Sequence, residues 1–501
     1  MKFLKSKIAV IGTGAAGLGI LTALLKKKNI EITVFDVFEE EDFPSLAKAT
    51  ELKVEKFYDE IYSEIKSKTS FKFPPPKTHF TKPLAKYKLD GKPGLFKSKS
   101  LGGLTNYWGG TSLAFTDNEL ENWHISRKDL NPYYSELSKL IGISSRNDKL
   151  DSYFGENFAT NPPYKITRMF DKLDESTNST SENEDNYQVI SGTNRVALET
   201  REGEVNSCIY CGECLAGCFS DSIYSTRKTI EKYLSDDRVK TVKGKVIRVE
   251  EGKVTVSAEN KVETYSGFSK IFIGAGCPNS TEIVLRSTGL TKSEKMADNA
   301  VYVFPILYLG KLDYKVVNEP YVSLCNLIFG FIPKSKDYKF AQAQVYSNFD
   351  YMWRYNIPEP IWKVVKSLVS YSRARVFWAR LYVSGEESQS YNCELVNDEI
   401  NFSGADKASN KNINELMKSV RNAVNKNGFY IPPVSPILQK TNSHYSSTFP
   451  YKGNLLDVSE SAEFLPNVYL CDSSVFPDLP AVSLTFTIMA NANRIVSEAM
   501  N

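Results

Sequence analysis

The sequence predicts an α/β protein with a Rossmann-type dinucleotide-binding domain and a second α+β domain built on an antiparallel sheet. Three observations support this prediction. A glycine-rich turn lies between two apolar strands near the start of the chain, within 7–36. Alternating apolar and polar residues recur over 301–440, which is typical of antiparallel strands with one solvated face. At 501 residues, the chain is too long for one simple domain.

The nucleotide site begins in KIAVIGTGAAGLGILTALLKKKNIEITVFD, residues 7–36. The apolar runs 8–11 and 30–35 should form strands, and the second ends on Asp36, where a ribose hydroxyl would be held. A helix beginning near Ala15 and Ala16 should separate them. The G-x-G-x-x-G spacing between the first strand and the helix lets backbone approach a pyrophosphate. Its glycines are Gly12, Gly14 and Gly17.

Two other interpretations of this stretch are an ordinary βαβ turn and a secretory signal. The ordered succession of strand, glycine turn, helix, strand and acid favours dinucleotide binding over the first. Lysines precede the apolar stretch as in a signal, but the glycines fall inside it and no small-residue cleavage pattern follows. We therefore expect a nucleotide site.

Composition narrows the class of protein. The 62 Lys and Arg residues nearly balance 59 Asp and Glu residues, so no basic excess indicates nucleic acid binding. No uninterrupted apolar run reaches the ~20 residues that span a bilayer. We expect a soluble, cytoplasmic enzyme with no nucleic acid partner and no transmembrane segment.

Further along the chain, glycines at 102, 103, 109 and 110 surround an aromatic and amide segment, which indicates backbone pressed against a flat ligand or a plain glycine-rich loop. The Pro- and Lys-rich stretch 74–99 should run extended across the surface. Ser126 and Asp129 have capping-box spacing, so a helix should cover 127–140. The polar stretch 171–186 should be a mobile loop.

A second strand-to-helix crossing is expected near the nucleotide, because KIFIGAG at 270–276 is a buried strand that ends in small residues, among them Ala275 and Gly276. The substrate part should contain strands at 341–345 and 375–383. Between them, 361–371 has apolar residues at helical spacing. This helix should pack on the protein, and peripheral contact with a membrane surface is the alternative.

With these features in place, the chain resembles the glucose-methanol-choline (GMC) oxidoreductase family, in its bacterial type with a Cys-rich segment. The C-terminal NVYLCDSSVFPDLPAVSLTFTIMANANR, residues 467–494, is similar to the family's closing pattern of a strand, an Asp before small residues, a Pro and a helix. NWHISRKDLNPYYSEL, at 122–137, resembles the segment after the family's flavin loop, and 245–247 resembles its adenine-side strand. The resemblance is weak over 301–430.

The resemblance implies bound FAD, whereas composition alone would equally allow NAD. It places the loop from Gly12 to Gly17 at the pyrophosphate, Asp36 at the adenosine ribose and Asp472 near the ribityl and phosphate groups. Val246 would lie beside the adenine. Thr105 and Asn106 would lie near the isoalloxazine, and Gly103 and Ser483 are the remaining expected cofactor contacts.

Three histidines occur in the chain, so histidine catalysis has few candidates. The resemblance places His444 at the active-site histidine position, where a neutral imidazole would accept the hydroxyl proton while the carbinol carbon passes hydride to flavin N5. A structural histidine bonded to backbone is the alternative. Ser483 stands where the family usually has Asn or His. We expect that a serine hydroxyl can still donate a hydrogen bond to a substrate oxygen, although its reach is shorter.

Four cysteines crowd into CIYCGECLAGC with the C-x₂-C-x₂-C-x₃-C spacing of a bacterial ferredoxin. Such spacing favours an iron–sulfur cubane over zinc. A reduced cysteine-rich loop packed near the flavin is an equal alternative. The four residues are Cys208, Cys211, Cys214 and Cys218.

These features predict an FAD-dependent oxidoreductase that acts on the CH–OH group of an alcohol or sugar and passes electrons to an acceptor that the sequence does not identify. A flavin-dependent reductase or isomerase, or a redox-inactive flavin-binding component of an assembly, are the alternatives. The expected FAD-binding domain is discontinuous and covers 1–115, 190–305 and 440–501. The expected substrate-binding domain covers 116–189 and 306–439.

Overall fold

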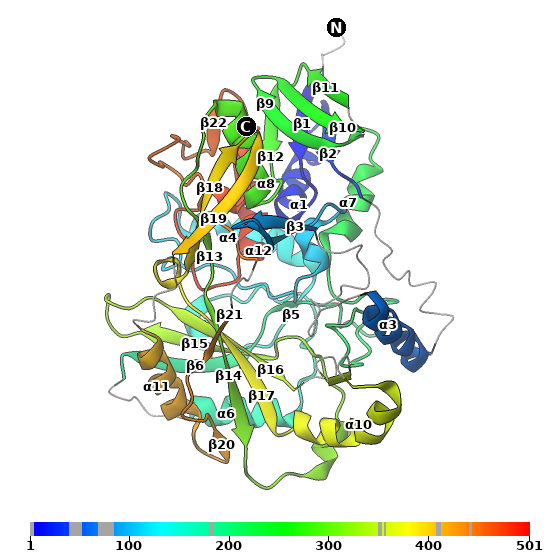
Figure 1. Ribbon diagram of the computed structural model, residues 1–501, viewed down its shortest axis with the longest axis vertical. Coiled ribbons are helices and arrows are strands. Elements are labelled where there is room, and N and C mark those ends of the chain that lie inside the picture. Colours follow the sequence, from blue (N-terminus) through cyan, green and yellow to red (C-terminus); the bar gives the residue numbers. More distant parts are fainter. Residues whose placement is uncertain are drawn as a thin grey trace.

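The computed structural model describes residues 5–39, 53–68, 85–179, 185–259, 261–348, 353–354, 357–406, 412–439 and 443–501. Figure 1 shows a parallel sheet with its helices in the upper half and an antiparallel sheet in the lower half. This arrangement has the predicted α/β class, with a Rossmann-type part and an α+β part.

A six-stranded sheet forms the centre of the Rossmann-type part. Its order is β22-β23-β12-β1-β2-β8, and all neighbours are parallel except the antiparallel pair β22 and β23. Ile8, Ala9 and Val10 in β1 are fully buried, as expected for a strand covered on both faces. The strands are β1 (Ser6–Ile11), β2 (Ile30–Asp36), β8 (Val239–Lys243), β12 (Lys270–Ile273), β22 (Glu463–Leu465) and β23 (Val468–Leu470).

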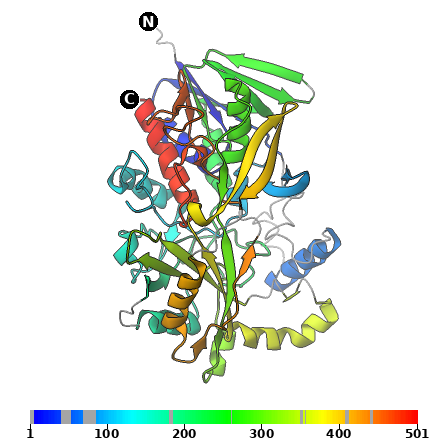
Figure 2. The ribbon, with the colours of Figure 1, turned by 60° about the vertical axis from the view of Figure 1, so that its left-hand side comes forward.

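Four helices accompany this sheet, namely α1 (Ala15–Leu24), α7 (Thr226–Leu234), α8 (Cys277–Thr288) and α12 (Thr485–Ala499). α1 and α12 lie against each other, one near each end of the chain (Figure 2). Gly19 permits this approach, because a Cβ there would come within 2.2 Å of the Met489 carbonyl oxygen. The contact brings the C-terminal segment next to the glycine loop.

Two smaller sheets flank the Rossmann-type part. One is the antiparallel meander β9 (Lys245–Glu250), β10 (Lys253–Ala258) and β11 (Lys261–Ser266). The other has the order β13-β18-β19-β3-β4. Its strands are β3 (Ala85–Leu89), β4 (Lys92–Lys97), β13 (Met296–Asp298), β18 (Gln389–Val396) and β19 (Glu399–Asp406).

The prediction that residues 74–99 run extended across the surface is wrong for the second half of this stretch. Residues 85–97 form the antiparallel hairpin β3–β4, which buries Tyr87 and Leu95. Tyr87 packs edge-on against Phe402 of β19, so long-range contacts stabilise a segment that its composition assigns to the surface. The triple proline lies outside the described residues.

A seven-stranded sheet, ordered β20-β14-β17-β16-β15-β6 with β21 paired to β14, forms the lower half. Its neighbours are antiparallel, as predicted. The strands are β6 (Tyr187–Thr193), β14 (Val301–Tyr308), β15 (Leu327–Pro333), β16 (Ala341–Ser347), β17 (Val376–Tyr382), β20 (Phe429–Tyr430) and β21 (Ile437–Gln439).

Two helices share a second hydrophobic core with this sheet: α6 (Arg168–Asn178) and α11 (Ile413–Val424). The predicted mobile loop at 171–186 is therefore wrong for its first half. The three apolar side chains Met169, Phe170 and Leu173 are buried against the sheet and order this otherwise polar helix. Residues 180–184 lie outside the described part of the chain.

The remaining helices and strands connect these sheets. The capping box of Ser126 and Asp129 starts α4 (Arg127–Ile141), as predicted. α10 (Glu359–Arg373) buries Trp362 but exposes 80% of Val364 and 69% of Leu368. Peripheral contact of this helix with a membrane surface therefore stays a prediction. The others are α3 (Val54–Lys68), α5 (Asp151–Phe154), β5 (Ile143–Ser144), β7 (Val196–Ala197) and the 3₁₀ turns η2 (Gly103–Asn106), η3 (Tyr314–Asn318), η4 (Gly385–Glu387) and η5 (Ser473–Val475).

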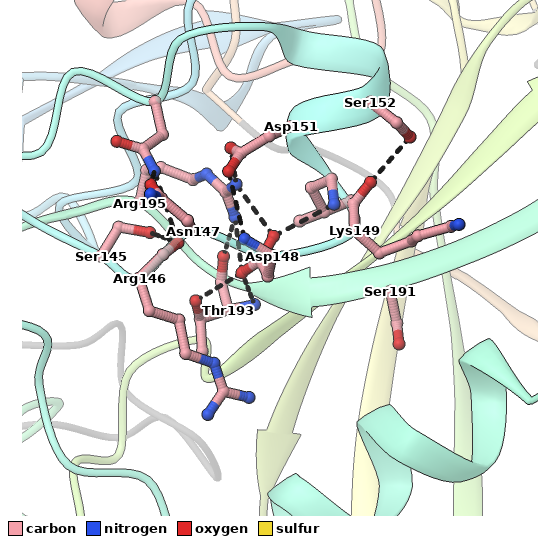
Figure 3. A network of polar contacts seen from close by, with 12 residues as sticks. Ser145, Arg146, Asn147, Asp148, Lys149, Asp151, Ser152, Ser191, Thr193 and Arg195 are labelled. Atoms are coloured by element: carbon pink, nitrogen blue, oxygen red, sulfur yellow. Dashed lines mark hydrogen bonds and ion pairs between the residues drawn. The ribbon is translucent and has the colours of Figure 1, made fainter.

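A buried ion-pair network ties the end of β6 to the start of α5 (Figure 3). The Arg195 side chain is 1% exposed, and its Nη2 lies 2.9 Å from Asp148 Oδ1 and 2.6 Å from Asp151 Oδ1. Thr193 donates from its backbone N and its hydroxyl to Asp148 Oδ2, both at 2.7 Å. These contacts hold the segment that enters β7.

No helix among the described residues has the length and apolar character that a membrane span requires.

Candidate active site

A cavity of about 570 Å³ opens between the glycine loop of the Rossmann-type part and the seven-stranded sheet. The structure brings most of the predicted site residues to its wall. Those that line it are Gly12, Gly14, Ala15, Ala16, Asp36, Gly103, Thr105, Val246, Ala275, Gly276, His444, Asp472 and Ser483. Gly17 and Asn106 are not among the lining residues.

The phosphate end of the cavity lies where two glycine loops meet. Gly14 caps α1, and the nearest described atoms to a Cβ built on it are the Gly102 carbonyl oxygen and Gly103 Cα, both 4.0 Å away. A side chain at Gly14 would therefore enter the cavity without a clash inside the protein. The unpaired N–H groups of the α1 N-terminus border the same space and favour an anion there. This cradle fits a pyrophosphate.

The other two glycines of the motif serve packing. A Cβ on Gly12 would lie 2.4 Å from the Gly274 carbonyl oxygen, and Gly12 has a positive φ of 97°. A Cβ on Gly17 would lie 2.3 Å from the Gly12 carbonyl oxygen. Both positions therefore need glycine so that the loop, α1 and β12 pack closely.

Asp36 closes the loop from the end of β2. Its Oδ2 accepts from the backbone N of Thr13 at 2.8 Å and from the Thr13 hydroxyl at 2.6 Å, while Oδ1 accepts from Val37 N at 2.6 Å. Burial raises the pKa of this carboxyl, and the hydrogen bonds partly offset that rise. Asp36 therefore uses much of its hydrogen-bond acceptor capacity on the backbone and hydroxyl groups of the glycine loop and its own strand end. Its side chain still lines the cavity.

Asp472 has a comparable role at the second crossing. Its Oδ2 accepts from Gly276 N at 2.9 Å and from the Ser280 hydroxyl at 2.5 Å. Its Oδ1 accepts from Ser474 N at 3.0 Å and from the Ser474 hydroxyl at 2.7 Å. The carboxylate thereby joins the C-terminal segment to the start of α8, and burial raises its pKa.

Thr105 and Asn106 lie in the 3₁₀ turn η2, which faces the N-terminus of α7. The Thr105 hydroxyl donates to the Gly102 carbonyl oxygen at 2.6 Å. Asn106 Nδ2 donates to the Ser100 hydroxyl and the Leu101 carbonyl oxygen, at 3.2 Å and 2.9 Å. Asn106 thus stabilises the glycine loop without being among the residues that line the cavity, whereas Thr105 is one of them.

His444 lies at the opposite end of the cavity, against the antiparallel sheet. Its backbone N donates to Asp298 Oδ1 at 3.0 Å, and its ring stacks on Tyr382 with centroids 5.6 Å apart. Burial, with a smaller contribution from the positive charge of Arg380, lowers the pKa of His444 to about 4. The imidazole is therefore neutral at pH 7.

A neighbouring amide fixes which ring nitrogen of His444 carries the proton. Asn299 Nδ2 donates to the carbonyl oxygens of Val383 and Pro480, both at 3.1 Å. This orients Asn299 Oδ1 toward His444 Nδ1, 2.9 Å away. Because an amide oxygen only accepts, Nδ1 must donate, and Nε2 keeps the lone pair of the neutral ring. The network therefore leaves the lone pair of the neutral ring on Nε2.

Ser483 is placed so that it can donate a hydrogen bond. Its hydroxyl oxygen accepts from Gln344 Nε2 at 3.3 Å, and Gln344 Oε1 in turn accepts from the Tyr346 hydroxyl at 2.7 Å. All three side chains line the cavity. The Ser483 hydroxyl hydrogen then remains to bond an oxygen of a bound molecule.

Sequence reasoning missed several residues of this end of the cavity. Gln344 and Arg380 come from strands of the weakly similar region, Gln439 comes from β21, and all three line the cavity with His444. Asn299 lies just before β14. For Arg380, the sequence contained a usable signal in RVFWARLY, residues 375–382. Every second side chain of a strand lies on the same face, so the alternation in this segment places Arg380 and Tyr382 on one face of the strand.

The second histidine that the structure describes lies outside this cavity. His124 packs edge-on against Tyr451, with ring centroids 4.6 Å apart, and burial lowers its pKa. It is not among the residues that line the cavity. His79 lies outside the described residues.

The prediction of an iron–sulfur cubane finds no support. Among the described residues, which include the whole cysteine segment, no group of three or more His, Cys, Asp or Glu side chains could hold a metal ion. The thiols pack in two apolar clusters: Cys211 against the cluster of α3 that contains Phe57, and the other three with the cluster that contains Val196. Burial raises the pKa of Cys208 to about 12 and that of Cys211 to about 11.

No protein-family model matches this chain, and no curated protein matches it either. Solved structures do. The chain is similar to pyridoxine 4-oxidase from Mesorbium loti, with 11% identity, 99% of both chains covered and a TM-score of 0.60. It is also similar to a variant of formate oxidase from Aspergillus oryzae RIB40, with 12% identity, 100% of this chain and 98% of that chain covered, and a TM-score of 0.60.

An FAD-dependent oxidoreductase from Chaetomium thermophilum is a third similar structure, with 10% identity, 99% of both chains covered and a TM-score of 0.59. At these identities, the likeness shows the fold alone. It confirms the predicted fold, a Rossmann-type domain combined with a second domain built on an antiparallel sheet.

Proposed function

We propose that this protein is an FAD-dependent oxidoreductase that oxidises a CH–OH group, with His444 as the general base. The observation that carries the proposal is a neutral imidazole, fixed by Asn299 with its basic nitrogen at Nε2, in the wall of a cavity that begins at a dinucleotide-type phosphate cradle. The fold that the chain shares with solved flavin oxidoreductases supports this assignment.

The residues that would hold FAD fit its parts. The α1 N-terminus and the glycines 14 and 103 suit the pyrophosphate, Asp36 and Val246 suit the adenosine, and Ala275 and Asp472 line the same cavity. When bound, FAD supplies a two-electron hydride acceptor. We also propose the division into an FAD-binding and a substrate-binding domain near the boundaries that the sequence predicts, with β6 and β14 kept whole in the substrate-binding domain.

The chain's own groups would act on the substrate hydroxyl. Nε2 of His444 accepts the hydroxyl proton as the carbinol carbon loses its hydrogen with both electrons of the C–H bond, so that an alcohol becomes a carbonyl. Ser483 donates a hydrogen bond to the same oxygen and fixes its position. The Asn299 carboxamide oxygen holds Nδ1–H and stabilises the imidazolium that forms.

Cofactor extraction and anaerobic visible spectra of the purified protein test the proposal. We expect extractable FAD and bleaching of its absorbance by a member of a panel of alcohols and sugars. Bleaching by NAD(P)H alone would favour the reductase alternative. A bound flavin that no member of the panel and no nicotinamide bleaches would favour the redox-inactive component. Mixing the reduced protein with oxygen, a quinone or a protein carrier then identifies the electron acceptor.

A further inference from the structure

One wall of the cavity is the face of the seven-stranded sheet that points away from α6 and α11. In β17, Phe377, Ala379 and Leu381 are buried in the core that these helices share. The intervening Arg380 and Tyr382 point to the other face and line the cavity. A cation therefore lies on the wall opposite the phosphate cradle.

Neighbouring side chains hold the Arg380 guanidinium in a fixed place. Its Nη2 donates to Gln439 Oε1 at 2.9 Å, and its carbon lies 5.5 Å from the centroid of the Tyr382 ring. Gln344 stands opposite Arg380 in the register of β16 and β17. An arginine held in this way presents planar donors in one orientation, which suits recognition of a carboxylate.

The charge of Arg380 acts in the same space as the base. It contributes to the lowered pKa of His444, and the two side chains flank the same Tyr382 ring. Among the described residues that line the cavity, the carboxylates are Asp36 and Asp472, and both accept several hydrogen bonds at the cofactor end. At the substrate end, Arg380 is therefore the charged side chain that lines the cavity beside His444, while Asp298 contacts the His444 backbone N from outside the lining.

We propose that Arg380 binds an anionic group of the substrate, and that the protein oxidises a small hydroxy acid or sugar acid whose carboxylate lies at Arg380 while its hydroxyl lies at His444. This inference rests on the proposed function. The carboxylate is unchanged in the reaction, since the hydroxyl proton passes to Nε2 and the hydride passes to FAD.

Calorimetric titration of the holoenzyme with sodium acetate, sodium oxalate and neutral acetamide tests the anion site without turnover. We expect the carboxylates to bind and acetamide to bind at least tenfold more weakly. Arg380→Gln should weaken carboxylate binding by roughly 10- to 100-fold, because hydrogen bonds to a charged group are lost. Arg380→Lys, which keeps the charge, should weaken it less.

Arg375→Gln is the matched control, because this arginine precedes β17 on the same chain segment and donates to the carbonyl oxygens of Tyr308 and Gly310 outside the cavity lining. It should leave carboxylate binding unchanged. Equal binding of acetate and acetamide by the native protein, or equal acetate binding by the native protein and a folded Arg380→Gln variant, would overturn the proposal.

Turnover separates this inference from the proposed function. Lactate and gluconate should reduce the bound flavin faster than lactamide and sorbitol, and Arg380→Gln should remove that preference by lowering kcat/KM for the acids alone. Faster reduction by the neutral compounds in the native protein would refute the acid substrate but keep the oxidoreductase. Arg380-dependent carboxylate binding, with no flavin reduction by any compound, would refute the proposed function but keep the anion site.

Discussion

Replacing His444 with alanine removes the proposed base while leaving the phosphate cradle intact. The cradle and His444 lie at opposite ends of the cavity, so we expect the variant to retain its flavin. A positioned base contributes a factor of roughly 10² to 10⁴. With a pKa of about 4, the imidazole is fully available at pH 7 but is a weaker base than an unperturbed histidine. We therefore expect the lower half of that range, about 10²- to 10³-fold or roughly 3 to 4 kcal/mol.

Anaerobic stopped-flow measurement of flavin reduction, with a substrate from the panel, gives the rate. The pH profile adds a second readout. Native kcat/KM should be level near pH 7 and should fall only as pH approaches about 4, where His444 takes up a proton. His444→Ala should lack this acid limb. His124→Ala is the control, because that histidine lies outside the cavity lining, and its reduction rate should match the native one.

An unchanged rate of reduction in flavin-loaded His444→Ala would refute the role of His444 and leave the fold assignment intact. The lowered pKa also has a consequence for stability. Below pH 6.5 the unfolded chain protonates this histidine while the folded protein does not, so the free energy of unfolding should fall as pH decreases from about 6.5 to about 4.

Three more expectations concern the cofactor, the core and the cysteines. Gly14→Val should fill the cradle and abolish flavin binding without a large fall in Tm, since the nearest atoms beyond its chain neighbours, the Gly102 carbonyl oxygen and Gly103 Cα, lie 4.0 Å from the added Cβ; a full flavin-to-protein ratio would contradict the phosphate assignment. Arg195→Gln should lower the free energy of unfolding by about 3 to 5 kcal/mol in urea titration, because it breaks a buried ion pair; Lys26→Gln, which breaks a more exposed pair with Glu136, should cost about 1 kcal/mol or less, and equal costs would contradict this account. The thiols of Cys208 and Cys211 should react slowly with Ellman's reagent in the native protein, and near-stoichiometric iron and acid-labile sulfide after anaerobic purification would restore the cubane prediction.

The local sequence determined the elements that begin and end on their own signals. The run of strand, glycine turn, helix and strand from β1 to β2 follows from apolar periodicity and from a glycine that a close local contact requires, because a Cβ on Gly17 would lie 2.3 Å from the Gly12 carbonyl oxygen. The helix α4 follows from the capping box of Ser126 and Asp129. In these cases, the deciding interactions join residues near each other in the chain, so one sequence suffices to predict them.

Only the tertiary structure decided the conformation of segments that are polar in composition but pack against the core. The contact between Tyr87 and Phe402 stabilises a hairpin in a lysine-rich stretch. Three apolar residues of the otherwise polar helix α6 pack against the seven-stranded sheet. The active site is the clearest case. His444 becomes a candidate base with a defined tautomer because Asn299, 145 positions away, bonds its Nδ1, and Arg380 becomes a binding group because strand pairing places it on the same wall. Such contacts depend on register and long-range packing, which a single sequence does not encode in any local pattern.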